Sequence, residues 1–222
     1  MQEKIFLLPG FGEDGFVFNE LLPYLNTHKK EIIKIDYRPV LDKFTFPFIT
    51  VQQFSNKLIK YYNINSNDKL IGHSMGGYFS FQIRELIGTD IIMIGSFNDP
   101  KKIIHILPQF PRFTLFTTIT GIAKQSWVKK YLLSKIKNEQ IKAIQSKIMD
   151  NFNNFTNNEL ALMLEMNYQQ KIKTNLPNPI RIHDKNDKIV SPPDEPYHQI
   201  KGGHFSLNIH PEEVYTIIKT IL

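Results

Sequence analysis

The sequence predicts a single α/β domain with a mostly parallel sheet and helices on both of its faces. Short apolar runs of strand length alternate with segments of helical spacing along most of the chain. The chain has 222 residues, enough for one well-buried core. Hydrophobic residues make up 41% and charged residues 22% of it, as in ordinary globular proteins.

The amino-terminal half alternates regularly between the two kinds of element. We expect strands where apolar residues follow one another, at residues 4–8, 31–36, 69–72 and 90–95. We expect helices where apolar residues recur at helical spacing, at residues 18–25, 51–62 and 78–86. Consecutive strands joined by helices indicate parallel pairing.

The alternation stops between residues 100 and 175. This stretch predicts helices at 113–124, 127–152 and 158–166, and no strand pattern interrupts them. Strands resume at 179–183 and 197–201, and a last helix is expected at 211–222. We therefore expect a core of residues 1–99 and 176–222, with residues 100–175 as a helical insertion between two of its strands.

Composition excludes several classes of protein. The chain has no cysteine, so disulfides, thiolate metal sites and cysteine nucleophiles are ruled out. Its start does not resemble a signal peptide, and no apolar stretch approaches the roughly 20 residues of a membrane span. We therefore expect a cytoplasmic protein that binds no nucleic acid and needs no metal or cofactor. The net charge of +6 would permit an acidic partner.

Ser74 is the best candidate for a nucleophile. It lies in Gly72-His73-Ser74-Met75-Gly76-Gly77, which reads G-x-S-x-G and falls between an expected strand and an expected helix. A sharp strand-to-helix turn exposes a serine hydroxyl to a histidine and to the next backbone N–H. The two flanking glycines remove side chains that would collide in such a turn. The stretch favours acyl-transfer chemistry on Ser74.

The glycine-rich turn after the first strand allows a rival interpretation. Gly10, Gly12 and Gly15 read G-x-G-x-x-G, and Asp36 ends the next expected strand, as in dinucleotide-binding turns. However, bulky Phe16 follows the turn where a pyrophosphate favours small residues. A dinucleotide-binding protein would also leave the serine turn without a role.

In a hydrolase the same turn would have a different task. The backbone N–H of Phe11 would face the oxygen that becomes negative when an acyl group is attacked. The N–H of Met75, directly after the nucleophile, would be the second donor of this oxyanion hole.

A serine nucleophile also needs a base and an orienting carboxylate. His204, in Gly202-Gly203-His204-Phe205, follows the last expected strand and is our choice for the base. For the acid we choose Asp187, in the turn after the strand at 179–183. Asp184 in the same turn and Asp99 after the preceding strand are the alternatives.

With these residues in place, the chain resembles the α/β-hydrolase superfamily from near residue 4 to its end. The resemblance implies Ser74 as nucleophile, His204 as general base and Asp187 as orienting acid, in that family's chain order. Residues 100–175 resemble the helical cap that such enzymes place over the pocket. Two departures stand out: Pro9 replaces the family's usual histidine, and the chain starts at the family's third strand, without its first two.

The insertion offers hints about substrate. It is rich in large apolar side chains, which either hold it to the sheet or line an acyl pocket; they are Phe110, Phe113, Phe116, Trp127, Phe152, Phe155 and Met163. It also carries many more lysines than acids. A basic rim suits an acidic acyl carrier protein, as in the pimeloyl-carrier methyl ester esterases of this superfamily. The expected substrate is a small-molecule ester or acyl thioester. The alternative that the resemblance allows is a non-catalytic binding protein with the same fold.

Overall fold

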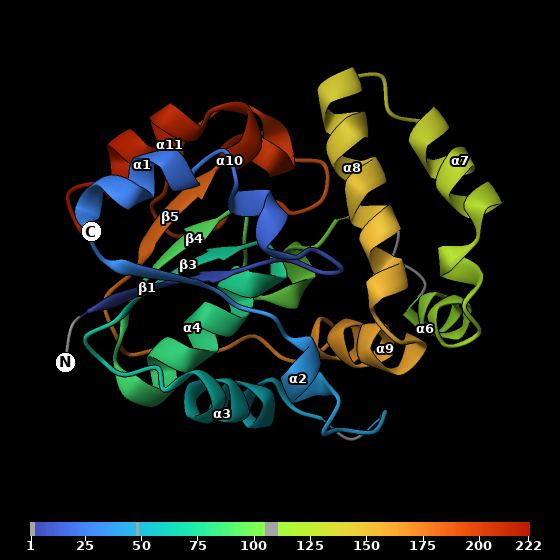
Figure 1. Cartoon of the computed structure of the whole chain (residues 1–222), viewed down its shortest axis with the longest axis horizontal. Coiled ribbons are helices and arrows are strands. Elements are labelled where there is room, and N and C mark those ends of the chain that lie inside the picture. The colour runs from blue at the N-terminus through green and yellow to red at the C-terminus, as the bar shows by residue number, and fades with distance from the viewer. Residues whose placement is uncertain (1–2, 48, 105–110) are drawn as a thin grey trace.

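A six-stranded parallel sheet forms the centre of the molecule (Figure 1). The computed structural model describes residues 3–47, 49–104 and 111–222. The strand order is β2-β1-β3-β4-β5-β6, and every pairing is parallel, which confirms the predicted sheet. The strands are β1 (Lys4–Leu8), β2 (Glu31–Lys34), β3 (Lys69–His73), β4 (Asp90–Ile94), β5 (Ile180–His183) and β6 (His198–Gln199).

Helices cover both faces of the sheet (Figure 1). One face carries α1 (Leu22–Leu25), α10 (Ser206–Ile209), α11 (Pro211–Ile218) and the 3-10 helix η1 (Gly15–Phe18). The other carries α2 (Arg38–Leu41), α3 (Val51–Tyr62) and α4 (Met75–Ile87). Further 3-10 turns are η2 (Asn26–His28), η3 (Pro100–Lys102) and η6 (Gly203–Phe205).

Alternate residues of each strand feed two separate hydrophobic cores, as the two-residue period of a strand requires. In β1, Phe6 and Leu8 pack with the helices α3 and α4. Ile5 and Leu7 point the other way and pack with α11 and η1. Because both faces are buried, the strands read as continuous apolar runs in the sequence.

The helix expected at residues 18–25 is broken in two. Residues 15–18 form η1, and α1 begins only at Leu22. Pro23 lies in the first turn of α1, where its missing N–H costs nothing, but it could not continue a helix from upstream.

Helices fill the segment between β4 and β5, and among its described residues there is no strand. They are α6 (Pro111–Ile119), η4 (Ile122–Lys124), α7 (Ser126–Ser134), α8 (Glu139–Asn151), η5 (Phe152–Asn154) and α9 (Asn157–Met166). In Figure 1 they stand together at one side of the sheet. We call residues 100–175 the inserted segment.

Two helix predictions in the inserted segment were too long. The helix expected at 127–152 is two helices, because the Asn138 side chain accepts hydrogen bonds from the N–H groups of Gln140 and Ile141 and starts α8 afresh. The helix expected at 113–124 stops at Ile119, and Gly121 takes a left-handed conformation (φ 77°) before η4.

Candidate active site

Ser74 occupies the turn between β3 and α4, as the motif predicts. Its backbone has φ 51° and ψ −123°, a conformation that costs about 1 to 3 kcal/mol in a residue with a side chain. Hydrogen bonds hold the turn in this shape: Ser74 N–H donates to Ile94 O (3.0 Å), and Ser96 Oγ donates to Ser74 O (2.6 Å). The turn is thus strained and braced from the neighbouring strand.

Close backbone approach explains the glycines around Ser74. A Cβ atom on Gly76 would lie 2.0 Å from the carbonyl oxygen of Leu8 at the end of β1. A Cβ on Gly72 would lie 2.5 Å from the Cα and N atoms of Gly77. Both neighbours are backbone and cannot turn aside as a side chain can. The G-x-S-x-G spacing is therefore a steric requirement of this turn.

His204 and Asp187 are in direct contact. Asp187 Oδ2 lies 2.8 Å from His204 Nδ1, and Asp187 Oδ1 accepts hydrogen bonds from the N–H groups of Ile189 (2.7 Å) and Val190 (3.1 Å). Burial alone would raise the pKa of the Asp187 carboxyl, but His204 and the two N–H groups outweigh burial, so the pKa lies below its usual value. Asp187 is therefore an ionised acceptor, and His204 Nδ1 carries the proton of this bond.

Asp184, the alternative acid, has a different role in the same turn. Its carboxylate accepts hydrogen bonds from Asn186 N–H (2.8 Å) and Gly203 N–H (2.7 Å). Burial would raise the pKa of the Asp184 carboxyl, but its hydrogen bonds outweigh burial and the pKa lies below its usual value. Asp184 thus ties the β5 turn to the loop that carries His204. Asp99, the other alternative, caps η3 by accepting from Lys101 N–H.

The candidate nucleophile and the His204–Asp187 pair lie at the same edge of the sheet. Ser74 directly follows β3, and Asp187 and His204 lie in the turns that follow β5 and β6. The carboxyl ends of parallel strands meet at one edge, which is where ligands bind in open α/β sheets. Gly95, which follows β4, lies against both members of the His204–Asp187 pair. A Cβ atom on Gly95 would lie 3.1 Å from His204 O and 3.7 Å from Asp187 Oδ2.

A second buried pair, Glu13 and His73, lies beside the candidate triad and was not foreseen. Glu13 Oε2 accepts from Gly10 N–H (2.5 Å) and lies 2.8 Å from His73 Nδ1, while His73 Nε2 lies 2.9 Å from His204 O. Both ring nitrogens of His73 therefore face hydrogen-bond acceptors. This arrangement suits the protonated imidazolium, in which both nitrogens are donors. Burial would lower the pKa of His73, but the Glu13 carboxylate outweighs burial and the pKa is raised.

The Glu13–His73 pair connects three parts of the site. It joins the turn after β1, the residue before Ser74, and the backbone of His204. Nothing in the sequence marked Glu13, because a glutamate in a glycine-rich turn is usually solvent-exposed.

The expected oxyanion-hole donors lie at the same edge. Met75 is the first residue of α4, and the first N–H groups of a helix have no acceptor within it. Phe11 lies in the turn after β1, in edge contact with the ring of Phe152 (5.5 Å between ring centroids). Asn151 Nδ2 donates to Gly12 O at 2.9 Å. The end of α8 and η5 therefore rest directly on this turn.

The large apolar residues of the inserted segment separate into two groups. Phe155 and Met163 are buried in the core that α3 and α4 share, so they hold the segment to the sheet. Phe113, Phe116 and Trp127 are exposed, so they do not hold the segment to the sheet. Phe110 lies outside the described residues.

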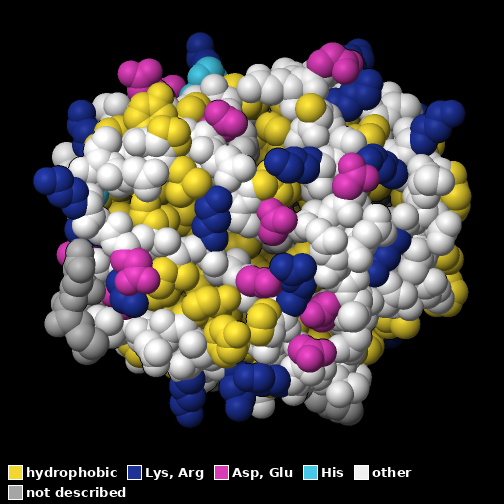
Figure 2. Space-filling model, in the orientation of Figure 1, with side chains coloured by type: hydrophobic (Ala, Val, Ile, Leu, Met, Phe, Trp, Pro, Cys, Tyr) yellow, Lys and Arg dark blue, Asp and Glu magenta, His cyan; other side chains and the backbone are white. Residues whose placement is uncertain are grey.

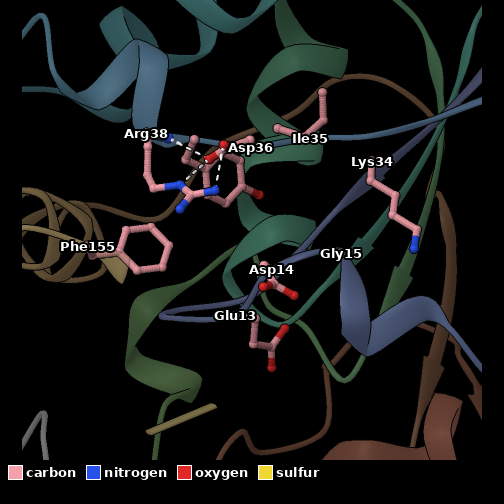
Figure 3. Close-up of a pocket in the computed structure, with 9 residues that line it drawn as sticks. Glu13, Asp14, Gly15, Lys34, Ile35, Asp36, Arg38 and Phe155 are labelled. Atoms are coloured by element: carbon pink, nitrogen blue, oxygen red, sulfur yellow. Dashed lines mark hydrogen bonds and ion pairs between the residues drawn. The ribbon is translucent and has the colours of Figure 1, made fainter. Parts of the chain in front are cut away.

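The hollow at the rival dinucleotide motif is acidic (Figure 3). It has a volume of about 150 Å³ and includes the carboxylates of Glu13, Asp14 and Asp36 in its lining, whereas Ser74 and His204 do not line it. Arg38 is engaged by Asp36 through two hydrogen bonds of 2.9 and 2.8 Å. The lining also contains Lys34, so its three carboxylates outnumber its two cations, and this balance disfavours binding of a pyrophosphate.

The described residues contain neither a membrane-spanning helix nor a metal-binding cluster. None of their helices is long and apolar enough to cross a bilayer. No group of three or more of their His, Asp and Glu side chains is arranged to hold a metal ion.

This chain is similar to known proteins in structure and not in sequence. No protein-family model matches the chain, and no curated protein sequence matches it. Solved structures do: a hydrolase from Oleispira antarctica superposes with a TM-score of 0.73 at 15% identity, over 99% of this chain and 90% of that one. A thermophilic esterase from Thermogutta terrifontis gives 0.71 at 16% identity, over 98% and 88%.

A bromoperoxidase from Bacillus anthracis is similar as well, with a TM-score of 0.66 at 17% identity, over 99% of this chain and 91% of that one. All three have the α/β-hydrolase fold, and so does this chain, as its sequence motifs implied. The three names differ in chemistry, and one fold hosts many activities. The function of this chain must therefore be argued from its own site.

Proposed function

We propose that this protein is a serine hydrolase that cleaves a carboxylic ester or thioester through an acyl-enzyme on Ser74. His204 takes the proton of the Ser74 hydroxyl as it attacks the acyl carbon, and Asp187 holds the imidazole in the required tautomer. The N–H groups of Phe11 and Met75 stabilise the oxyanion. Water activated by His204 then releases the acid.

The observation that carries this proposal is the left-handed backbone of Ser74. A serine that needed only to fold would relax to a lower-energy conformation, whereas a strained residue persists where function requires its position. The 2.8 Å contact between Asp187 and His204 supports the same conclusion, because it leaves Nε2 of the imidazole as the proton acceptor.

The inserted segment is proposed as a cap over this site. The contacts of Asn151 and Phe152 with the turn at Gly12 support that role, because they bring α8 and η5 onto the proposed oxyanion loop. An acidic carrier protein as the acyl donor remains a prediction from the lysine excess of the segment.

A graded panel of p-nitrophenyl esters and acyl thioesters tests the proposal. The wild-type protein should turn over at least one class, and Ser74→Ala should lower kcat by about a million-fold if the three residues act as a unit. If the two proteins hydrolyse every substrate equally slowly, the fold serves as a ligand-binding scaffold instead.

A further inference from the structure

The outer face of the inserted segment exposes an unusual amount of apolar surface. Of nine large hydrophobic residues that are exposed among the described residues, six belong to α6 and α7. We call them the outer apolar face; they are Phe113, Phe116, Ile119, Trp127, Tyr131 and Leu132. The aromatic members are 58 to 66% exposed, although burying such rings is strongly favourable. A patch of this kind marks an interaction site.

The two helices of this face are consecutive in the chain, and α7 has no buried residue. Both α6 and α7 pack against η4, which connects them. On α6 the exposed residues Phe113, Phe116 and Ile119 recur every third position, while Thr114 and Thr118 are buried on the opposite side. In Figure 2 hydrophobic side chains reach the right-hand edge of the molecule, where Figure 1 places α6 and α7, with lysine and arginine side chains nearby.

The stretch of chain that carries this face has charges of a single sign, although Lys129 is paired with Asp150 of α8 and Lys102 with Asp194. Between residues 100 and 138 the sequence contains no Asp or Glu. It contains eight basic residues there, namely Lys101, Lys102, Arg112, Lys124, Lys129, Lys130, Lys135 and Lys137. Lys135 Nζ lies 5.0 Å from the centroid of the Tyr131 ring, so apolar and basic groups are interleaved. Arg112, Lys130 and Lys137 are exposed and have no carboxylate partner within the described part of the chain.

This charge decides between the possible occupants of the face. A second copy of the chain in a two-fold dimer would bring the same lysines against one another, which is unfavourable. An anionic lipid surface fits both features. Aromatic and leucine side chains enter the boundary between headgroups and acyl chains, while lysines extend their charged ends to the lipid phosphates.

We propose that the outer apolar face docks the protein on an anionic lipid surface. Docking uses Trp127, Phe113 and Phe116 as the inserted groups and the surrounding lysines as the electrostatic attachment. The helix α7 packs on α8, whose end contacts the turn at Gly12, so the lipid lies on the side of the inserted segment away from the sheet. The proposal goes beyond the hydrolase chemistry and does not depend on it.

The chain carries its own probe for this docking, because Trp127 is its only tryptophan. Trp127 emission is measured in the full-length protein with vesicles of mixed phosphatidylglycerol and phosphatidylcholine, and with vesicles of phosphatidylcholine alone. We expect a blue shift, quenching by brominated acyl chains, and partition at least about tenfold stronger to the anionic vesicles, weakening as salt is added. The Ser74→Ala variant should dock as well as the wild type, which separates this proposal from the catalytic one.

Matched variants assign the effect to this face. Phe113→Ser with Phe116→Ser, and separately Lys130→Glu with Lys137→Glu, should each weaken partition about tenfold or more while retaining Trp127. Lys57→Glu with Tyr61→Ser makes similar changes at exposed positions of α3 and should leave partition unchanged. Circular dichroism and thermal unfolding confirm that each variant is folded.

Several results would overturn the proposal. One is an emission spectrum that no vesicle changes; another is equal loss of partition in the α3 control. Sedimentation showing a dimer that Phe113→Ser with Phe116→Ser dissolves would assign the face to a second copy. Binding to an acidic acyl carrier protein through Lys130 and Lys137, without any vesicle binding, would assign it to a protein partner.

Discussion

Replacing Asp187 by asparagine should remove most of the catalytic activity while preserving the fold. In the structure Asp187 Oδ1 accepts two backbone N–H groups and Oδ2 faces His204 Nδ1 at 2.8 Å. The asparagine oxygen can keep the two backbone bonds, and its NH₂ group then faces Nδ1. An NH₂ donor requires an unprotonated Nδ1, so the proton moves to Nε2 and the imidazole no longer accepts a proton from Ser74.

The size of this effect follows from the change of tautomer. In a serine protease the corresponding change lowers kcat by about 10⁴, which is about 5.5 kcal/mol of transition-state stabilisation. We expect a similar loss of kcat, little change in KM, and a loss in unfolding free energy of about 1 to 3 kcal/mol. Steady-state hydrolysis of the best p-nitrophenyl ester and urea denaturation measure the two quantities.

Asp184→Asn is the matched control for Asp187→Asn. Asp184 is in the same turn and accepts backbone N–H groups of Asn186 and Gly203, but it does not contact the imidazole. Its replacement should lower kcat by about tenfold or less, through loosening of the His204 loop. The assignment of the acid is refuted if Asp184→Asn costs more activity than Asp187→Asn.

Two further substitutions test the supports of the site. Gly76→Ala should cost at least about 3 kcal/mol in unfolding free energy, because its Cβ would lie 2.0 Å from Leu8 O. Gly88 has φ 76° but no neighbour within 4 Å, so Gly88→Ala should cost only about 1 to 2 kcal/mol. Equal costs for the two variants in urea denaturation would contradict the steric account. Glu13→Gln should destabilise the protein by about 3 kcal/mol near pH 5.5, since it leaves buried His73 without its carboxylate. The pKa of His73 is raised in the folded state, so this stabilisation is complete below the unfolded-state pKa and is lost as pH rises through the folded-state pKa. The difference in unfolding free energy between wild type and Glu13→Gln should therefore narrow toward alkaline pH. A difference that stays constant with pH would rule out a charged His73.

The serine turn could be predicted because its determinants are local. Steric crowding at Gly72 and Gly76 acts within a few residues of Ser74 and therefore leaves a fixed spacing in the sequence. The parallel sheet was predictable for a similar reason, since strands buried on both faces must be continuously apolar.

Other parts of the site depend on contacts between distant residues. The sequence favoured Asp187 but left Asp184 open, because the choice depends on which carboxylate faces a histidine 17 residues away along the chain. The Glu13–His73 pair joins residues 60 positions apart and has no local pattern at all. The helix breaks at Gly121 and Asn138, in contrast, had local signals in the sequence, which the longer apolar periodicity obscured.

Mapping the residue that becomes covalently modified tests the central claim most directly. The wild-type protein is incubated with a fluorophosphonate probe, and intact mass and peptide fragments are measured beside Ser74→Ala and Asp187→Asn. A reacting triad predicts one adduct per chain on the peptide containing Ser74, none in Ser74→Ala, and markedly slower labelling in Asp187→Asn. An unlabelled wild-type protein, or an adduct that persists in Ser74→Ala, would contradict the account.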